Sequence, residues 1–98
     1  MTNEPIQLRL YISGKSPNSM IALKNLQAIC EEHLSDSHHI EVIDLFEHPY
    51  RAIEDGVMLT PLLVIPSSPP VSIIGNLSDA ESVLNFLTSA SKNHDVTE

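Results

Sequence analysis

Two serines at the start of a predicted helix are the first candidate nucleophiles of this 98-residue chain. Ser16 and Ser19 bracket the tetrapeptide Ser16-Pro17-Asn18-Ser19, which follows a predicted strand. A serine hydroxyl attacks a substrate only when a base removes its proton, and the sequence identifies no histidine or lysine in that role. A hydroxyl followed by proline is instead typical of a helix N-terminus. We therefore expect these serines to cap the helix.

Cys30 is the only cysteine, and its thiol is the other candidate for chemistry. It falls in the middle of the predicted helix, on the apolar stripe and away from both helix ends. Buried cysteines of this kind behave as small hydrophobic residues, so packing is favoured over reactivity. A single cysteine cannot form an intramolecular disulfide, which fits a reducing compartment and predicts a cytoplasmic protein.

The histidines and carboxylates give weaker signals. Cys30 and His33 are three positions apart, but two ligands on one helix face do not make a zinc site, even with His38-His39 nearby. We therefore expect neither a metal nor another cofactor. A second group of acids follows the next strand and surrounds a short helix; it is either a solvated face or a surface for a basic partner, and the sequence leaves both open. Its members are Asp44, Glu47, Glu54 and Asp55.

The elements that position these residues follow from hydrophobic periodicity. Alternating or continuous short apolar runs predict strands, and a repeat near 3.6 residues predicts helices. The run at 40–46 is dense enough to suggest a strand covered on both faces. The predicted elements are strand 6–12, helix 17–34, strand 40–46, helix 49–55, strands 62–65 and 71–74, and a last helix with the apolar face Val83, Leu84, Phe86 and Leu87.

Turn residues set the boundaries of these elements. Ser35-Asp36-Ser37 is expected to end the long helix, and Gly56 to end the short helix that His48-Pro49 opens. The connection at 66–70 is short and proline-rich, which favours an antiparallel hairpin between the strands on either side of it. Ser78 and Glu81 form a predicted capping box for the last helix. The polar residues after Ala90 are expected to fray.

This order of elements predicts a thioredoxin-like fold. A strand, helix and strand with short links favour two parallel strands, so βαβαββα gives a central four-stranded mixed sheet. The chain is one domain, 1–98, with an ordered core of about 6–90 and a polar tail, 91–98. In this fold a Cys-x-x-Cys pair occupies the first strand-to-helix junction, where this chain has Ser16 and Ser19. Binding is therefore favoured over redox catalysis, and Thr60-Pro61 is expected to be the cis-proline of the fold.

Composition excludes several classes of partner. The chain has 13 acidic and 5 basic residues and a net charge of −8. Nucleic acids and anionic membranes both need clustered lysine and arginine, so neither is expected. The polar start, Met1–Pro5, indicates no signal peptide, and no apolar run approaches the ~20 residues of a membrane span. The acidic surface suits a partner with a basic patch.

Seven motifs in order identify a family resemblance. From about Leu8 to Leu84, the chain resembles the KaiB family of clock proteins. The matching motifs are Leu8-Arg9-Leu10-Tyr11-Ile12-Ser13-Gly14, Ser16-Pro17-Asn18-Ser19, Ala22-Leu23-Lys24-Asn25-Leu26, Val42-Ile43-Asp44-Leu45, Thr60-Pro61, Pro69-Pro70-Val71 and Ile74-Gly75-Asn76-Leu77-Ser78-Asp79.

The resemblance implies a binding protein that is not an enzyme. KaiB proteins bind KaiC, a hexameric RecA-like ATPase and autokinase, and the cyanobacterial complex also captures KaiA. A related domain in a sensor kinase competes for the same KaiC surface, which implies a possible sensor kinase pathway. The family also has a ground-state fold with a rearranged C-terminal half, and it forms homodimers and homotetramers. The residues that carry the structural signature are Ser16, Pro17, Asn18, Ser19, Thr60, Pro61 and Gly75.

The chain departs from the family at its basic contact positions. Only Lys24 remains basic; the other matching positions hold Ile21, Glu41, Gly56, Ile65 and Ser72. In the last helix, Phe86 and Thr88 replace a family glycine and aspartate, and Phe86 is the better helix and core residue. We therefore expect the thioredoxin-like form to dominate. The contact is expected within residues 40–65 above all, and the predicted partner-binding residues are Lys24, Glu41, Ile43, Gly56 and Ile65.

Three functions remain open from the sequence. The first is a non-catalytic module that regulates a KaiC-type ATPase or a related signalling partner. The second is a thiol oxidoreductase that uses Cys30 alone. The third is a stress or two-component signalling adaptor that keeps the fold but no longer binds KaiC.

Overall fold

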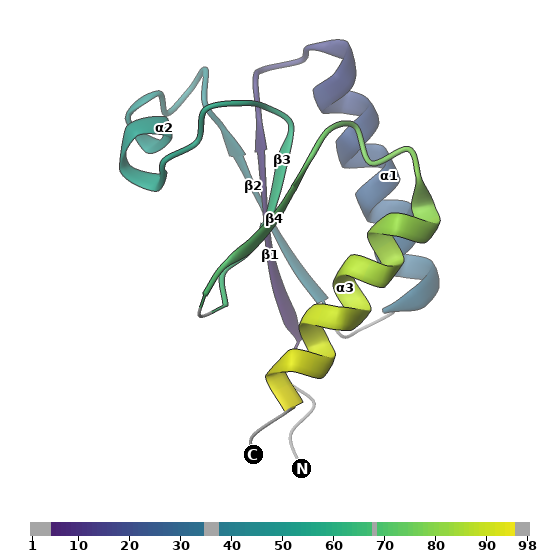
Figure 1. The fold of residues 1–98 in the computed structure, drawn as a ribbon. Coiled ribbons are helices and arrows are strands. Elements are labelled where there is room, and N and C mark those ends of the chain that lie inside the picture. Colours follow the sequence, from purple (N-terminus) through teal and green to yellow (C-terminus); the bar gives the residue numbers. More distant parts are fainter. Residues whose placement is uncertain (1–4, 35–37, 68, 96–98) are drawn as a thin grey trace.

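The structure is a computed structural model that describes residues 5–34, 38–67 and 69–95. It confirms the predicted order of elements, which Figure 1 traces along the chain. The elements are β1 (Ile6–Ile12), α1 (Pro17–His33), β2 (His38–Asp44), α2 (Tyr50–Asp55), β3 (Leu62–Ile65), β4 (Val71–Ile74) and α3 (Ala80–Asp95).

The four strands form one mixed sheet in the order β2-β1-β3-β4. β1 runs parallel to β2, with Leu10 opposite Val42. β3 is antiparallel to both of its neighbours, and β3 and β4 form the predicted hairpin. This topology follows from chain lengths, because the long helix α1 carries the chain across to a parallel strand, whereas 66–70 is too short for such a crossover.

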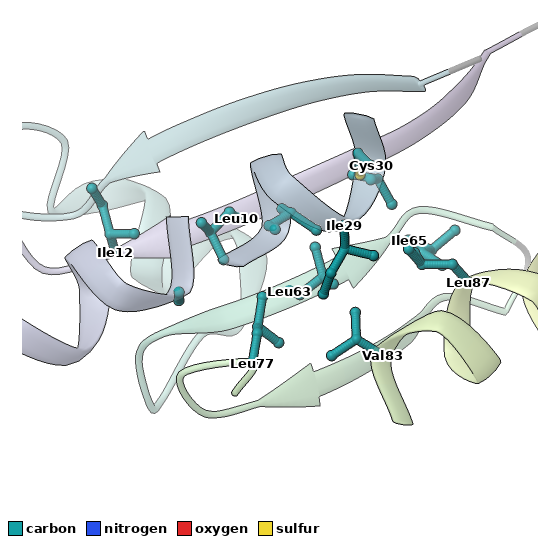
Figure 2. Packing of buried hydrophobic residues seen from close by; sticks show 12 residues of the cluster. Leu10, Ile12, Ile29, Cys30, Leu63, Ile65, Leu77, Val83 and Leu87 are labelled. Carbon is teal, nitrogen blue, oxygen red and sulfur yellow. The ribbon is translucent and has the colours of Figure 1, made fainter. Parts of the chain in front are cut away.

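The main core lies between the sheet and the two long helices. α1 and α3 cover the same face of the sheet in Figure 1, and Figure 2 shows Leu10 and Leu63 of the sheet with Cys30 of α1 and Val83 of α3. Every second residue of β1 points into this core, as the alternation in its sequence predicts. The buried members are Leu8, Leu10, Ile12, Ala22, Leu26, Ile29, Cys30, Leu63, Ile65, Leu77, Val83 and Leu87.

A smaller core lies on the opposite face of the sheet. Tyr11, Ile43 and Val57 are buried there, and Leu45, Leu62 and Val64 pack against them. α2 is on this side of the sheet, away from α1 and α3 (Figure 1), and it buries none of its own side chains. α2 therefore lies over this face, and the residues that pack against it come from the segments before and after the helix, such as Leu45 and Val57.

The structure corrects two expectations about β2. The strand ends at Asp44 rather than at 46, because the Asp44 side chain accepts hydrogen bonds from the backbone N–H of Gly14 and of Phe46, both at 2.9 Å, and this turns the chain. β2 is also not covered on both faces: it is an edge strand, and Glu41 and Val42 are exposed. A dense apolar run therefore did not indicate burial here.

The helix ends also differ from the predicted ones. Ser16 occupies the N-cap position of α1, but its side chain makes no capping hydrogen bond. At α3, Asp79 rather than Ser78 is the cap: its carboxylate accepts hydrogen bonds from the N–H and hydroxyl of Ser82, and these bonds lower the pKa of Asp79. α3 extends from Ala80 to Asp95.

Other predicted boundaries agree with the structure or lie outside the described residues. Gly56 ends α2 in the left-handed conformation, with φ of 70°. The predicted stop at Ser35-Asp36-Ser37 lies outside the described residues, and so does Ser68 in the hairpin connection. None of the helices in the described part of the chain combines the length and apolar character that a membrane span needs.

Candidate interaction site

A cluster of hydroxyl groups lies at the β1–α1 turn. The Ser19 side chain is fully buried, and its Oγ accepts hydrogen bonds from the Ser13 N–H at 3.0 Å and from the Ser16 hydroxyl at 2.8 Å. The Ser13 and Thr60 hydroxyl oxygens are 2.6 Å apart, and the Thr60–Pro61 peptide bond is cis, as predicted. The turn therefore contacts the segment that holds the cis-proline, Thr60-Pro61. The Ser16 hydroxyl donates to Ser19 in this cluster instead of capping α1.

The arrangement gives these serines no means of nucleophilic attack. Within the described residues, the partners of the Ser16 and Ser19 hydroxyls are each other and a backbone N–H. Activation requires a general base within hydrogen-bond reach. The cluster therefore holds the turn in shape, and it occupies the place where the fold can carry a redox pair.

Cys30 is placed for packing, as predicted. Its side chain has no solvent exposure in the core between α1 and the sheet, and burial raises the pKa of the thiol to about 11. The thiol is thus protonated at neutral pH. It also lies roughly 21 Å along the helix from Ser16, at 1.5 Å per residue. In the described residues, no three histidine, cysteine or carboxylate side chains gather into a group that could hold a metal ion.

The second feature of the site is a projecting segment that we call the α2 lobe, residues 45–59. Both of its ends are fixed to the β1–α1 turn: Asp44 accepts from the Gly14 N–H, and Thr60 contacts Ser13. Its middle is fixed to the sheet, because the Tyr11 hydroxyl donates to Asp55 Oδ2 at 2.7 Å. The lobe is therefore an excursion of the chain from β2 to β3, on either side of β1, and both residues that flank it, Asp44 and Thr60, are held at the β1–α1 turn.

The charges around Asp55 support its hydrogen bond with Tyr11. The Tyr11 hydroxyl and then the Arg51 guanidinium hold the pKa of the Asp55 carboxyl below its ordinary value, against the opposing effect of burial. Arg51 Nη2 and Nε lie 3.0 and 3.1 Å from the same oxygen, Asp55 Oδ2. Burial, and then the hydrogen bond to Asp55, raise the pKa of Tyr11. At neutral pH the pair is thus a phenol donating to a carboxylate.

We expect Asp55→Asn to reduce the free energy of unfolding by about 1 kcal/mol at pH 7, the value of one such hydrogen bond. Because the folded pKa of Asp55 is lowered, its contribution is present above the ordinary value of 3.8 and is lost as the pH falls through the folded pKa. Urea unfolding at pH 7 and well below pH 3.8 measures this difference. The control is Glu54→Gln, an exposed neighbour; an equal effect of both substitutions at both pH values would contradict the assignment.

Most of the exposed large apolar side chains in the described residues lie on the α2 lobe. Ile53 and Met58 are 85% and 92% exposed, and the described residues hold only three other exposed large apolar side chains outside this segment, namely Ile21, Val42 and Ile74. The exposed apolar side chains of the lobe are Phe46, Tyr50, Ile53, Met58 and Leu59.

The Phe46 ring lies against the backbone of the β1–α1 turn, in space that is open only because Gly14 has no side chain. A Cβ atom at Gly14 would lie 2.6 Å from Phe46 Cδ2, and Gly14 has φ of +57°. We expect Gly14→Ala to destabilise the fold by about 2 kcal/mol, from the left-handed backbone and the displaced ring. Urea unfolding of Gly14→Ala, Phe46→Ala and the double variant measures this. Relief of part of the loss in the double variant is expected; strict additivity would contradict the contact.

The predicted partner-binding residues do not form one surface. Lys24 is exposed on α1 and Gly56 is exposed on the α2 lobe, on opposite sides of the sheet. Glu41 is exposed on β2 and lies 3.5 Å from Arg9. Ile43 and Ile65 are buried, in the smaller and the main core respectively. In this fold, neither isoleucine offers its side chain to a partner, because each stabilises a core.

The predicted signature residues do come together. Ser16 and Ser19 form the hydroxyl cluster at the N-terminus of α1, with Pro17 and Asn18 between them. Thr60 joins this cluster, and the Gly75 N–H donates to the carbonyl oxygen of Pro61 at 3.0 Å. The signature is thus one structural unit at the end of the sheet where β1 leads into α1.

The sequence reasoning missed the anchor and the apolar surface of the α2 lobe. Arg51 and Asp55 are four positions apart, a spacing that favours an ion pair on a helix, and this signal was available. Nothing in the sequence indicated that Tyr11, 44 positions from Asp55, would donate a hydrogen bond to it. Asp44 and Asp55 were predicted to belong either to a solvated face or to a surface for a basic partner; in the structure both accept specific hydrogen bonds within the chain.

Comparison with solved structures defines the fold class first. The chain is similar to the germline-specific thioredoxin Deadhead of Drosophila melanogaster, with a TM-score of 0.65 and 11% identity over 88% of this chain and 81% of that one. It is also similar to oxidized mitochondrial thioredoxin 3 of Saccharomyces cerevisiae, with a TM-score of 0.66 and 13% identity over 88% and 79%. The fold is thioredoxin-like.

Sequence comparison then gives the family. The KaiB domain model matches residues 9–89, so the chain belongs to the KaiB family. Circadian clock protein KaiB3 of Synechocystis sp. is 46% identical over 80 residues, which cover 81% of this chain and 78% of that protein. Circadian clock oscillator protein KaiB of Microcystis aeruginosa is 46% identical over 78 residues, covering 79% and 75%.

Proposed function

We propose that this protein is a non-catalytic binding module that regulates a KaiC-type ATPase and autokinase by docking on it in the cytoplasm. The observation that carries the proposal is the KaiB domain match over residues 9–89, together with the clock proteins that resemble the chain. A clock-related role in protein interaction follows from that kinship. Neither a cofactor nor a nucleic acid or membrane partner is part of the proposal.

The geometry supports docking rather than catalysis. Ser16 and Ser19 lie where a thioredoxin-like fold can hold a redox pair, and their hydroxyls are bound to one another. The α2 lobe beside them exposes aromatic and long aliphatic side chains, residue types that act as anchors in protein interfaces. Lys24 and Glu41 lie outside this surface, so we assign the first contact to the lobe and to Gly56 within it.

An adaptor in a stress or sensor kinase pathway is the second candidate. The observation that favours it is Glu41, an acidic residue where the family resemblance implies a basic contact. Oxidoreductase activity through Cys30 is not supported, because the thiol is buried and its pKa is raised to about 11.

We expect the purified chain to form a complex with the KaiC-type ATPase of its own organism, with a dissociation constant of about 1 μM, which corresponds to roughly −8 kcal/mol. Size-exclusion chromatography and biolayer interferometry with nucleotide present measure the complex, and ATP hydrolysis measures regulation. A thioredoxin serves as a control of the same fold. Absence of binding at about 100-fold higher concentration would refute the ATPase partner and favour the adaptor.

A further inference from the structure

The α2 lobe carries exposed acidic residues next in the chain to its exposed apolar side chains. Glu47 follows Phe46 in the chain, and Glu54 follows Ile53, and both glutamates are exposed. Within residues 45–59 the lysine and arginine count is one, Arg51, and its guanidinium is held by Asp55. The free charges beside the apolar anchors are therefore negative.

This charge pattern argues against three occupants. A second copy of the chain would bring Glu47 and Glu54 against another acidic surface, since each copy carries a net charge of −8. A nucleic acid or an anionic bilayer would meet the same repulsion. Like charges placed across an interface suppress wrong partners, whereas opposite charges steer the right one.

We propose that the α2 lobe recognises a protein surface whose apolar pocket is rimmed by lysine or arginine. The apolar side chains enter the pocket, and Glu47 and Glu54 face the basic rim. The inference rests on the proposed function for the statement that the chain acts by docking on a protein. What it adds is the chemistry of the partner surface, an apolar pocket surrounded by basic side chains.

The structure explains how so small a segment can serve as a docking surface. Its ends are tied to Ser13 and Gly14, and its helix is tied to Tyr11, so its backbone is held before any partner arrives. A surface ordered in advance loses less conformational entropy on binding. The anchors Ile53 and Met58 need only dehydrate, as they are already presented to solvent.

Two synthetic helical peptides test the partner chemistry without the ATPase. They share the same leucine stripe and carry either lysine or glutamate beside it. Amide NMR titration at about 50 mM salt is expected to show at least tenfold tighter binding of the lysine peptide, with shifts confined to residues 45–59 and the adjoining turn. Equal binding of both peptides, binding of neither, or shifts on the α1–α3 face would overturn the inference.

Matched variants separate the apolar and charged contributions. Ile53→Ser with Met58→Ser is expected to weaken lysine-peptide binding at least tenfold, whereas Ile21→Ser, an exposed isoleucine on α1, leaves it unchanged. Retained binding in the lobe variant would overturn the inference. Circular dichroism melts establish that each variant is folded.

The charge test uses a second matched pair. Glu47→Lys with Glu54→Lys is expected to weaken binding of the lysine peptide at least tenfold at about 50 mM salt and to remove most of its salt dependence. Glu31→Lys with Glu32→Lys makes the same charge change on α1, where both residues are exposed, and is expected to weaken it less than threefold. Equal losses in the two variants would show that net charge, not the lobe, governs binding.

The same variants distinguish failure of this inference from failure of the proposed function. If the ATPase does not bind the parent chain but the lysine peptide binds the lobe, the ATPase partner is wrong and the inference stands. If the ATPase binds and Glu47→Lys with Glu54→Lys leaves that binding unchanged, the inference is wrong and the proposed function stands.

Discussion

Substituting Ser16→Cys and Ser19→Cys together is expected to create a disulfide-exchange activity that the parent chain lacks. The two hydroxyl oxygens are 2.8 Å apart at the N-terminus of α1, so sulfur atoms there are near enough to pair. The helix N-terminus stabilises a thiolate, and a pKa of about 7, as in thioredoxin, would make roughly half of the attacking sulfur a thiolate at pH 7. The parent has no thiol at this turn.

Reduction of insulin disulfides with excess dithiothreitol measures this gain. The substitutions are made in a Cys30→Ser background, and Ser16→Cys alone is the matched control, because a single thiol cannot close the disulfide. Activity of the double variant well above that of both controls is expected. An inactive double variant would show that the turn does not have redox-pair geometry, and Cys30-dependent activity of the parent would contradict a non-catalytic function.

Leu63→Ala is expected to destabilise the fold by about 3 kcal/mol. Leu63 lies in β3, has no solvent exposure and belongs to the main core between the sheet and the two long helices (Figure 2). Shortening it removes buried apolar contacts and leaves a cavity. In a domain of this size, a loss of that order lowers the melting temperature by roughly 12–24 °C.

Leu59→Ala is the matched control, because Leu59 is 60% exposed on the α2 lobe. Its effect on unfolding is expected to stay within about 0.5 kcal/mol. Urea denaturation of both variants at neutral pH gives the two free energies. Similar losses for Leu63→Ala and Leu59→Ala would mean that β3 is not the buried strand described here.

The element order was predictable because this chain signals it locally. β1 alternates strictly, and β3 and β4 are short apolar runs separated by prolines, so their bounds were predicted to the residue. Cys30 was correctly assigned to the core, because its place on the apolar stripe of α1 determines its burial. These are cases in which one pattern is enough to choose between alternatives.

The errors occurred where a side-chain hydrogen bond of the folded chain, distant or local, decides the outcome. β2 ends early because Asp44 contacts Gly14, 30 positions away. Ser16 does not cap α1 because its hydroxyl donates to Ser19 instead, and that preference arises only once the turn is folded. At α3, two adjacent residues, Ser78 and Asp79, were both capable caps, and the sequence alone does not rank them.

The interaction site was only partly predictable. The signature residues were identified by resemblance, and the structure brings them together at the β1–α1 turn. Ile43 and Ile65 were chosen by position in the family, without regard to burial, and both lie in cores. The exposed apolar side chains of the α2 lobe were missed. A helix of six residues has fewer than two turns, which is too short for hydrophobic periodicity to show which side faces water.

Amide NMR mapping of the isotope-labelled chain with the KaiC-type ATPase tests most directly whether the chain acts by docking through the α2 lobe. With substoichiometric ATPase, docking through the α2 lobe is expected to remove the signals of residues 45–59 and of the turn at Ser13 and Gly14. Amides around Lys24 on α1 are expected to keep their intensity. Signal loss centred on α1 and α3, or no loss anywhere, would contradict it.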